Sequence, residues 1–158
     1  MNNTLAKLDN LLEHKELVKF AGIRLGKRLI QNNEESLGLI LIARSYKHDQ
    51  SKFFGKEFDN LNGFVNSEPE LKEAICHHRS VNDHHPEYMG KIQLMSDYCL
   101  TEFICDIWAR CALTGQDVRE WLRNEGTRRY NLTDPSKTMT RIMFFVDLLI
   151  DQPAKRIG

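Results

Sequence analysis

The sequence predicts an all-α fold, a single-domain helical bundle of about six or seven helices. Apolar residues recur at helical spacing along most of the chain, and no segment alternates convincingly enough to predict a strand. The 158 residues show no internal repeat and are enough to close one hydrophobic core. We therefore expect one domain over residues 1–158, with the motifs in a core of about 10–115 and C-terminal helices over 117–152.

The first half of the chain is expected to hold two long helices. Apolar residues at helical spacing predict one long helix, or two, up to residues 32–33. A further helix should run from about 34 to 48, so that its last turn carries His48 and Asp49. A short amphipathic piece follows, and residues 60–68, which are rich in Asn, Gly and Ser, predict a loop.

Proline and glycine divide the second half. Pro69 should open a helix that ends near His78. Residues 81–90 cannot be helical throughout, because the residue before a proline is pushed out of the helical region. Three more helices are predicted, over 91–113, from 117 to a stop at Gly126, and from the cap Asp134-Pro135 to a point before Pro153.

The composition argues against several classes of function. The chain has 22 basic and 22 acidic residues, which leaves no electrostatic case for a protein that wraps nucleic acid or binds anionic membranes. The four cysteines form no Cys-x-x-Cys pair and predict reduced thiols. The apolar runs are shorter than the roughly 18 residues of a membrane helix, and the N-terminus lacks an export pattern. We expect a soluble cytoplasmic protein.

Histidine is concentrated in one part of the sequence. Five of the six histidines fall between positions 48 and 85, and two carboxylates, Glu102 and Asp106, follow downstream. Imidazole and carboxylate are the ordinary ligands of divalent and redox metals, so this pattern predicts a metal centre. The candidate ligands are His14, His48, Asp49, His77 or His78, His84 or His85, and Asp106.

The residues leave open whether one or two metals bind. Two imidazoles and one carboxylate suffice for one ion, whereas two ions a few ångströms apart need about five or six ligands with a bridging carboxylate. His14 is as readily an ordinary histidine as a ligand, and a single metal is favoured without it. Glu102 and Asp106 are four residues apart on one helix face, where one carboxylate could bind metal and the other a water or a ligand imidazole.

Three motifs carry a resemblance. Residues 48–52 resemble the His-Asp-x-Gly-Lys signature of the HD superfamily of metal-dependent phosphohydrolases, with Ser51 in place of the glycine. The order His, His-Asp, His, His, Asp is also that of the superfamily's ligands. The chain is more closely similar to an uncharacterised family of small HD-like proteins of bacteria and their phages, through His-Asp-x-Ser-Lys-Phe at 48–53, His-x3-Asn-x-His-His-Pro-Glu-Tyr at 78–88 and Glu-x3-Asp-x-Trp at 102–108.

The resemblance implies one or two divalent ions (Mn, Mg, Co, Zn or Fe) and hydrolysis of a phosphomonoester or nucleotide in the bacterial or phage-infected cytosol. The metal ligands that it implies are His14, His48, Asp49, His78, His84, His85 and Asp106. It implies Lys52 as the cation that neutralises charge on the phosphoryl oxygens. Glu57, Glu87 and Glu102 compete for the role of general acid or base, and we favour Glu102.

Several alternatives remain at the level of the sequence. The same ligand order occurs in di-iron HD oxygenases. A metal site with every position filled by protein could instead stabilise a non-catalytic module that acts by binding a partner. The family spacing favours His78 over His77 as a ligand. Arg123, Arg128 and Arg129 are either a phosphate-binding patch or, more commonly, a solvated helix end. We expect a small phosphate ester or nucleotide as the partner, no membrane, no strong case for nucleic acid, and a possible homo-oligomer.

Overall fold

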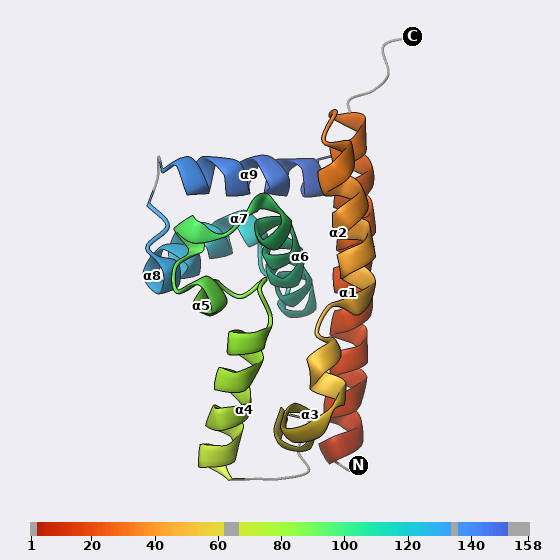
Figure 1. The fold of residues 1–158 in the computed structure, drawn as a ribbon, viewed down its shortest axis with the longest axis vertical. Coiled ribbons are helices and arrows are strands. Elements are labelled where there is room, and N and C mark those ends of the chain that lie inside the picture. Colours follow the sequence, from red (N-terminus) through yellow and green to blue (C-terminus); the bar gives the residue numbers. More distant parts are fainter. Residues whose placement is uncertain (1–2, 62–66, 134–135, 152–158) are drawn as a thin grey trace.

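The computed structural model describes residues 3–61, 67–133 and 136–151. Every regular element in these ranges is helical and none is a strand, which confirms the predicted all-α class. Two long helices, α1 (Asn3–Gln31) and α2 (Glu35–Lys47), lie side by side along one edge of the molecule (Figure 1). None of the described helices is both long enough and apolar enough to cross a membrane.

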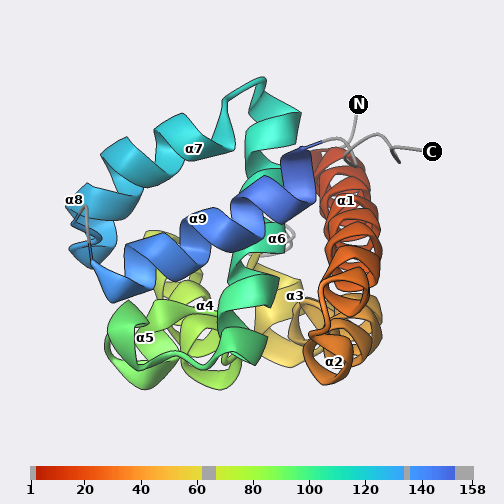
Figure 2. The same cartoon turned by 90° about the horizontal axis from the view of Figure 1, so that it is seen from above.

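The other helices lie on one side of this pair (Figure 1). They are α3 (Gly55–Leu61), α4 (Glu68–Val81), α5 (Pro86–Met89), α6 (Asp97–Thr114), α7 (Val118–Trp121), α8 (Thr127–Tyr130) and α9 (Lys137–Ile150). Short turns of 3-10 helix at Gln50–Phe53 and Ile92–Leu94 and a π-helical turn at Leu122–Gly126 complete the list. Helix α6 contacts α1, α2 and α9, and the C-terminal end of α9 meets α1 (Figures 1 and 2).

Glycine lets α1 and α2 approach closely. A Cβ atom added to Gly26 would lie 2.7 Å from the carbonyl oxygen of Gly38 and 2.6 Å from Cγ1 of Ile42. A Cβ atom on Gly38 would in turn collide with the carbonyl oxygen of Gly26. Because the two helices are joined by a short turn and run in opposite directions, this contact sets their register, and the rings of His14 and His48 come within 5.8 Å of each other.

Helix α6 is buried around most of its circumference. Every residue from Cys99 to Ile107 is buried, including the large side chain of Phe103. Burial of one such apolar side chain contributes roughly 1.5–3 kcal/mol to folding. Glu102 and Asp106 belong to the same buried stretch, and buried carboxylates are costly unless they are paired. The side chains that pair with Glu102 and Asp106 therefore show where polar groups are buried in the protein.

Two helix boundaries differ from the predicted ones. Helix α6 begins at Asp97 instead of residue 91, because the Ser96 hydroxyl accepts a hydrogen bond from the backbone N–H of Cys99 and caps the helix there. The helix predicted to stop at Gly126 continues through α8. Gly126 keeps right-handed helical dihedrals, and the left-handed residue that ends the helix is Asn131, with a φ of 53°.

Two predicted features touch residues outside the described ranges. The predicted cap Asp134-Pro135 lies outside them, and α9 is capped by Ser136, whose hydroxyl accepts from the backbone N–H of Met139. Of the predicted loop over 60–68, residues 62–66 also lie outside the description. The predicted end of the last helix before Pro153 agrees with the observed end of α9.

Candidate metal centre

The predicted metal ligands come from separate elements and meet in the interior. Helix α1 supplies one histidine, the end of α2 supplies the His-Asp pair, α4 and the loop after it supply three histidines, and α6 supplies an aspartate. These residues are His14, His48, Asp49, His78, His84, His85 and Asp106, and all of them are buried. The fold thus gathers every candidate ligand into one cluster.

The chain leaves α2 in a way that turns the His-Asp pair inward. Helix α2 ends at Lys47, so the pair follows the helix and does not form its last turn as predicted. Asp49 has a φ of 54°, in the left-handed region that few residues other than Gly, Asn and Asp adopt. Neighbouring side chains on a continuing helix diverge by about 100°. The bend instead brings His48 Nε2 to 3.4 Å from Asp49 Oδ2.

Helix α4 and the proline-stiffened loop after it supply the remaining histidines. The helix ends at Val81, past its predicted end at His78, so His78 lies in its last turn. His84 and His85 lie between this helix and Pro86, the first residue of α5. Since the loop is only a few residues long, both imidazoles return to the helix end, and the Nε2 atoms of His78 and His85 are 2.9 Å apart.

Among the described residues, three groups of side chains could hold an ion. Two of them share Asp49, and we call these the ligand groups: His14, His48 and Asp49, and Asp49, His78, His84 and His85. The third consists of His48, His84 and Glu102. The two oxygens of the shared carboxylate face different sides, since Oδ2 is near His48 and Oδ1 lies 3.2 Å from His78 Nε2. Oδ1 is also 3.4 Å from His84 Nε2. Asp49 therefore has the placement of a bridging carboxylate.

Asp106 extends the first group. Its Oδ1 lies 2.9 Å from His14 Nε2 and 3.7 Å from His48 Nε2. At a ligand–metal distance of about 2.1 Å, neighbouring ligand atoms lie roughly 3.0 Å apart in an octahedron and roughly 3.4 Å apart in a tetrahedron. The separations given above run from 2.9 to 3.7 Å, close to these values, and all ligand atoms within a group lie within 4.8 Å of one another.

Poorly satisfied polar atoms are a second observation that bears on the metal hypothesis. Among the described residues, four buried atoms of the cluster make no hydrogen bond of good geometry, although each has another atom of the cluster nearby. They are His14 Nε2, His48 Nε2, Asp49 Oδ1 and His84 Nε2. Each unsatisfied buried group costs about 1–3 kcal/mol, so folded proteins rarely leave several of them facing one another. A coordinated cation would satisfy all four. Imidazole nitrogen and carboxylate oxygen suit divalent ions such as Zn, Fe, Co or Mn.

Glu102 contacts two ligand histidines at Nδ1, the ring nitrogen that does not face Asp49. Its Oε1 lies 3.0 Å from His48 Nδ1 and 3.4 Å from His84 Nδ1. Because a carboxylate only accepts, a proton lies on His48 Nδ1, and Nε2 is the ring nitrogen that faces the cluster. Arg44 Nε donates to the other oxygen of Glu102 at 2.6 Å, and Asp83 pairs with the Arg44 guanidinium. The Glu102 carboxylate, expected as a general acid or base, is thus engaged on both oxygens.

Glu57 contacts the ligand histidine His78 at Nδ1, as Glu102 contacts His48. Its Oε2 lies 2.9 Å from His78 Nδ1, and its Oε1 lies 2.7 Å from His77 Nδ1. The Ser51 hydroxyl donates to Glu57 Oε2 at 2.7 Å and accepts from the Asn82 side-chain amide at 3.0 Å. Ser51 and Asn82, which belong to the sequence motifs, therefore help to hold Glu57 beside His78. His77 contacts Glu57 and belongs to neither ligand group, which agrees with the choice of His78.

The carboxyl groups of the cluster are held in their ionised form. Burial raises the pKa of Asp106, but Arg110, His14 and His48 outweigh it and hold the pKa well below its usual range. The pKa of Asp49 is also held well below its usual range in spite of burial, with His48 the largest opposing cause. Burial lowers the pKa of His48, yet the surrounding carboxylates raise it to about 9. This negative environment also favours a metal cation.

A cavity of about 220 Å³ opens beside the ligands. His78, His85 and Asp106 form part of its wall, so a small molecule in it would reach the cluster. The other walls carry cationic and aromatic side chains, including Lys52, Arg79, Arg110, Arg129, Trp121 and Tyr130. A cation-lined space next to a metal centre suits an anionic ligand.

Two of these cations contact ligand carboxylates. Lys52 Nζ donates to Asp49 Oδ2, and Arg110 Nε donates to Asp106 Oδ1 at 3.1 Å. Lys52 was expected from the sequence, whereas Arg110 and the orienting Arg44 were not. Both arginines stand four residues from a ligand along the chain, Arg44 before His48 and Arg110 after Asp106. The spacing of Asp106 and Arg110 is a signal by which Arg110 could have been found, whereas Arg44 pairs with residues that are distant in the sequence.

The fold and the site together define an all-α protein with a buried histidine and carboxylate cluster that is suited to holding metal. A family model described as a family of unknown function (DUF5662) matches residues 3–147, and the chain belongs to this family. The matched range includes the whole cluster, from His14 to Asp106. No curated protein and no solved structure matches the chain.

Proposed function

We propose that the protein is a metal-dependent phosphohydrolase of the HD type that cleaves a phosphomonoester or nucleotide. The observation that carries the proposal is the cavity with metal-ligand side chains on one wall and cations on the others. The two ligand groups would hold one or two divalent ions, with Asp49 between them. A divalent ion bound there would lower the pKa of a water molecule and polarise the phosphoryl group.

The side chains of the chain then have distinct tasks. Glu102 and Glu57 keep the ligand imidazoles oriented through their Nδ1 atoms. In hydrolysis the water oxygen bonds to phosphorus, the ester P–O bond breaks, and one water proton ends on the released alcohol. Lys52, Arg110 and Arg129 line the cavity and would neutralise the charge that develops on the phosphoryl oxygens.

The open cavity also bears on the rival functions. A structural metal site has every coordination position filled by protein, whereas His78, His85 and Asp106 border a space large enough for a small ligand. A di-iron oxygenase would use the same ligand types. The cationic walls favour phosphate hydrolysis over that reaction, because guanidinium and ammonium groups match phosphate oxygens in charge and geometry.

The test combines metal analysis with a phosphatase screen. Protein purified without chelator is expected to carry one or two divalent ions per chain and to release phosphate from some of a panel of nucleotides and sugar phosphates. The double variant His48→Ala, Asp49→Ala should lose both properties, while the control Asp59→Ala, at an exposed carboxylate on α3, should keep them. The proposal fails if wild type and double variant carry the same trace metal and neither releases phosphate. Visible absorption of a mixed-valent iron pair would favour the oxygenase.

A further inference from the structure

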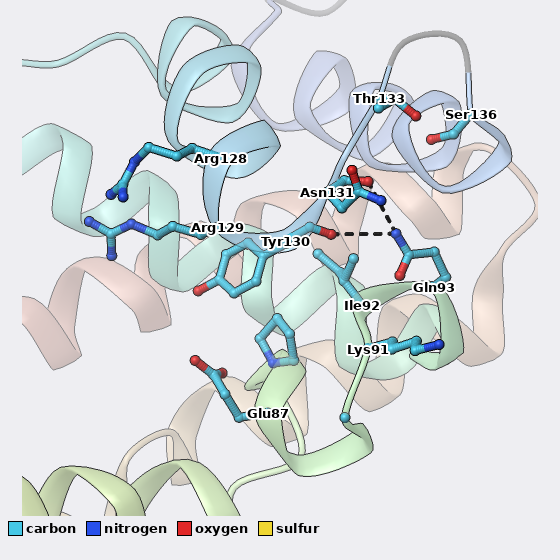
Figure 3. Close-up of a pocket in the computed structure, with 12 residues that line it drawn as sticks. Glu87, Lys91, Ile92, Gln93, Arg128, Arg129, Tyr130, Asn131, Thr133 and Ser136 are labelled. Carbon is cyan, nitrogen blue, oxygen red and sulfur yellow. Dashed lines mark hydrogen bonds between the residues drawn. The ribbon is translucent and has the colours of Figure 1, made fainter.

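A second and larger hollow adjoins the cationic cavity. It has a volume of about 780 Å³ and lies between α5, the turn Ile92–Leu94, the end of α8, residues 131–133 and Ser136 (Figure 3). We call it the outer groove, and we call the 220 Å³ space the inner cavity. Arg129 and Tyr130 line both. These two residues therefore form the boundary between the outer groove and the space that reaches the metal ligands.

The two spaces differ in chemistry. The inner cavity concentrates cations, whereas much of the outer groove is lined by neutral groups that form hydrogen bonds, including Gln93, Asn131, Thr133 and Ser136. Pro86 and the buried Ile92 add apolar surface. Figure 3 shows Arg128 and Arg129 extending together at one end of the groove, with Thr133 and Ser136 at the other. Of the three cations of the groove, Arg129 also lines the inner cavity, whereas Lys91 lies away from the arginines, near Gln93 (Figure 3).

The boundary between the two spaces is held in place. The ring of Tyr130 packs edge-on against Phe103, with the ring centres 5.6 Å apart. The Gln93 side-chain amide donates to the backbone oxygens of Tyr130 and Asn131, at 3.4 and 3.3 Å (Figure 3). Arg129 lies over the ring of Trp121, 5.8 Å from its centre. A fixed boundary of this kind can align a ligand that extends through both spaces.

The charge at the groove end is partly neutralised by the protein. Glu125 Oε2 accepts from Arg128 at 2.7 Å and from Arg129 at 2.8 Å. On the opposite side, Glu87 lines the groove and lies 3.3 Å from Arg79. The cations of the inner cavity are also paired with carboxylates, so the difference lies in number. The outer groove is lined by three cations and Glu87, whereas the smaller inner cavity is lined by four cations and Asp106. The larger, less charged groove suits the uncharged part of a ligand.

We propose that the outer groove binds the organic part of the substrate, and that the substrate is a phosphate ester of a bulky, uncharged alcohol rich in hydrogen-bonding atoms, of nucleoside size. This inference rests on the proposed phosphohydrolase function. Small-molecule sites in proteins usually have volumes of about 300–1,000 Å³. The inner cavity is below that range and has room for the phosphate, whereas the outer groove is within it and has room for the remainder.

The test uses the metal-loaded protein and a substitution that fills the groove. Thr133 is exposed on the groove wall, and Thr133→Trp would occupy its volume without touching the ligand cluster. Thr140→Trp, at an exposed threonine on α9 that lines neither space, is the matched control. Gln93→Ala, also exposed, is a second groove variant with a smaller change in volume. Thermal denaturation of each variant checks that it is folded.

Two readouts separate this inference from the proposed function. In kinetics, Thr133→Trp should raise KM for nucleoside 5′-monophosphates by about tenfold or more and leave kcat/KM for glycerol phosphate within about twofold, because only the larger ester fills the groove. In calorimetry, the free nucleoside, the alcohol product, should bind wild type and Thr140→Trp but not Thr133→Trp. Gln93→Ala should weaken nucleoside binding to an intermediate degree.

Each outcome bears on one claim or both. Hydrolysis of bulky and small esters with equal kcat/KM in all variants, together with no nucleoside binding, overturns the groove assignment and leaves the phosphohydrolase. Nucleoside binding that the groove variants remove, without hydrolysis of any ester, supports the groove as a nucleoside site and overturns the phosphohydrolase. Neither binding nor hydrolysis overturns both.

Discussion

Glu102 Oε1 accepts a hydrogen bond from His48 Nδ1 at 3.0 Å in the interior of the protein. The bond fixes the ring so that Nε2 faces the ligand cluster, and Arg44 holds the carboxylate from its other oxygen. A group engaged in this way is placed to orient a ligand. To exchange a proton with substrate, it would have to give up that bond. The sequence had favoured the proton-transfer role, so the two roles need an experiment that separates them.

Glu102→Gln provides that experiment. The substitution keeps the shape of the side chain and removes its charge, so the His48 and His84 imidazoles become poorer metal ligands. We expect metal affinity to fall by about 10–100-fold, which is the usual effect of losing a group that orients a ligand. Glu120→Gln, at an exposed glutamate, is the control. Metal titration decides the matter, since unchanged affinity with lost turnover would assign Glu102 to proton transfer.

The shared position of Asp49 predicts how metal content responds to single substitutions. His14→Gln removes a ligand from one group only, and His85→Gln removes a ligand from the other. Each should lower the metal content measured by elemental analysis by about one ion per chain, if two ions bind. Asp49→Asn should reduce it further than either, because both groups use this carboxylate. An unchanged metal content in His14→Gln would indicate a single ion at the Asp49, His78, His84 and His85 group.

Lys52→Ala should separate turnover from metal binding. Lys52 Nζ donates to Asp49 and lines the inner cavity, so its charge is available to a phosphoryl group. Removing a cation beside a ligand carboxylate leaves the site more negative, and metal affinity should not decrease. The loss of one stabilising donor should lower kcat by about 100–1,000-fold, whereas Lys52→Arg should retain part of it. A loss of metal from Lys52→Ala would mean that the lysine serves to position Asp49.

Which residues gather in the cluster could be predicted from residue types, while the internal arrangement of the cluster could not. Clustered imidazoles and carboxylates predicted metal ligands, because few other uses require so many of them. The orienting contacts depend on pairs that are distant in the chain, with Arg44 and Glu102 separated by 58 positions and Glu57 and His78 by 21. No local pattern encodes such a pairing. It follows from how the helices pack.

The fold class followed from periodicity, and the errors arose at residues with more than one use. Gly126 was interpreted as a helix stop, yet it is a buried helical residue where an added Cβ would lie 3.3 Å from Cδ1 of Leu132. Asp49 carries no signal for a left-handed bend, because aspartate is also common at ordinary turns. In both cases tertiary packing decides between conformations that the local sequence allows.

The metal-free protein is expected to be most stable near pH 6.5. The pKa of His48 is raised to about 9, so its contribution is complete below the ordinary value of 6.5 and is lost as the pH rises through about 9. The pKa of His85 is lowered to about 2 by burial and by His84 and His78. Below pH 6.5 the unfolded chain therefore binds a proton that the folded chain does not, and stability falls with decreasing pH.

Thermal denaturation of chelator-treated protein over about pH 5 to 9 measures the loss of stability on each side of the optimum, which gives an acid limb and an alkaline limb of the stability curve. The alkaline limb should amount to at most about 3 kcal/mol, since one pKa unit corresponds to about 1.4 kcal/mol. His48→Gln should flatten that limb and leave the acid limb in place. A stability that is constant above pH 6.5 in the wild type would contradict the assignment of a proton to His48.

The contact of Gly26 with Gly38 predicts a structural effect on metal binding from a distant position. Gly38→Ala would force its methyl group against the Gly26 carbonyl oxygen and push α1 from α2. Overpacking of this kind costs about 1–3 kcal/mol, although alanine favours helices. Because α1 carries His14 and α2 leads to His48, the substitution should weaken metal binding as well as lower the melting temperature. Ser36→Ala, at an exposed position on α2, should do neither. If Gly38→Ala is as stable as wild type, the two helices can separate without cost and glycine does not set their register.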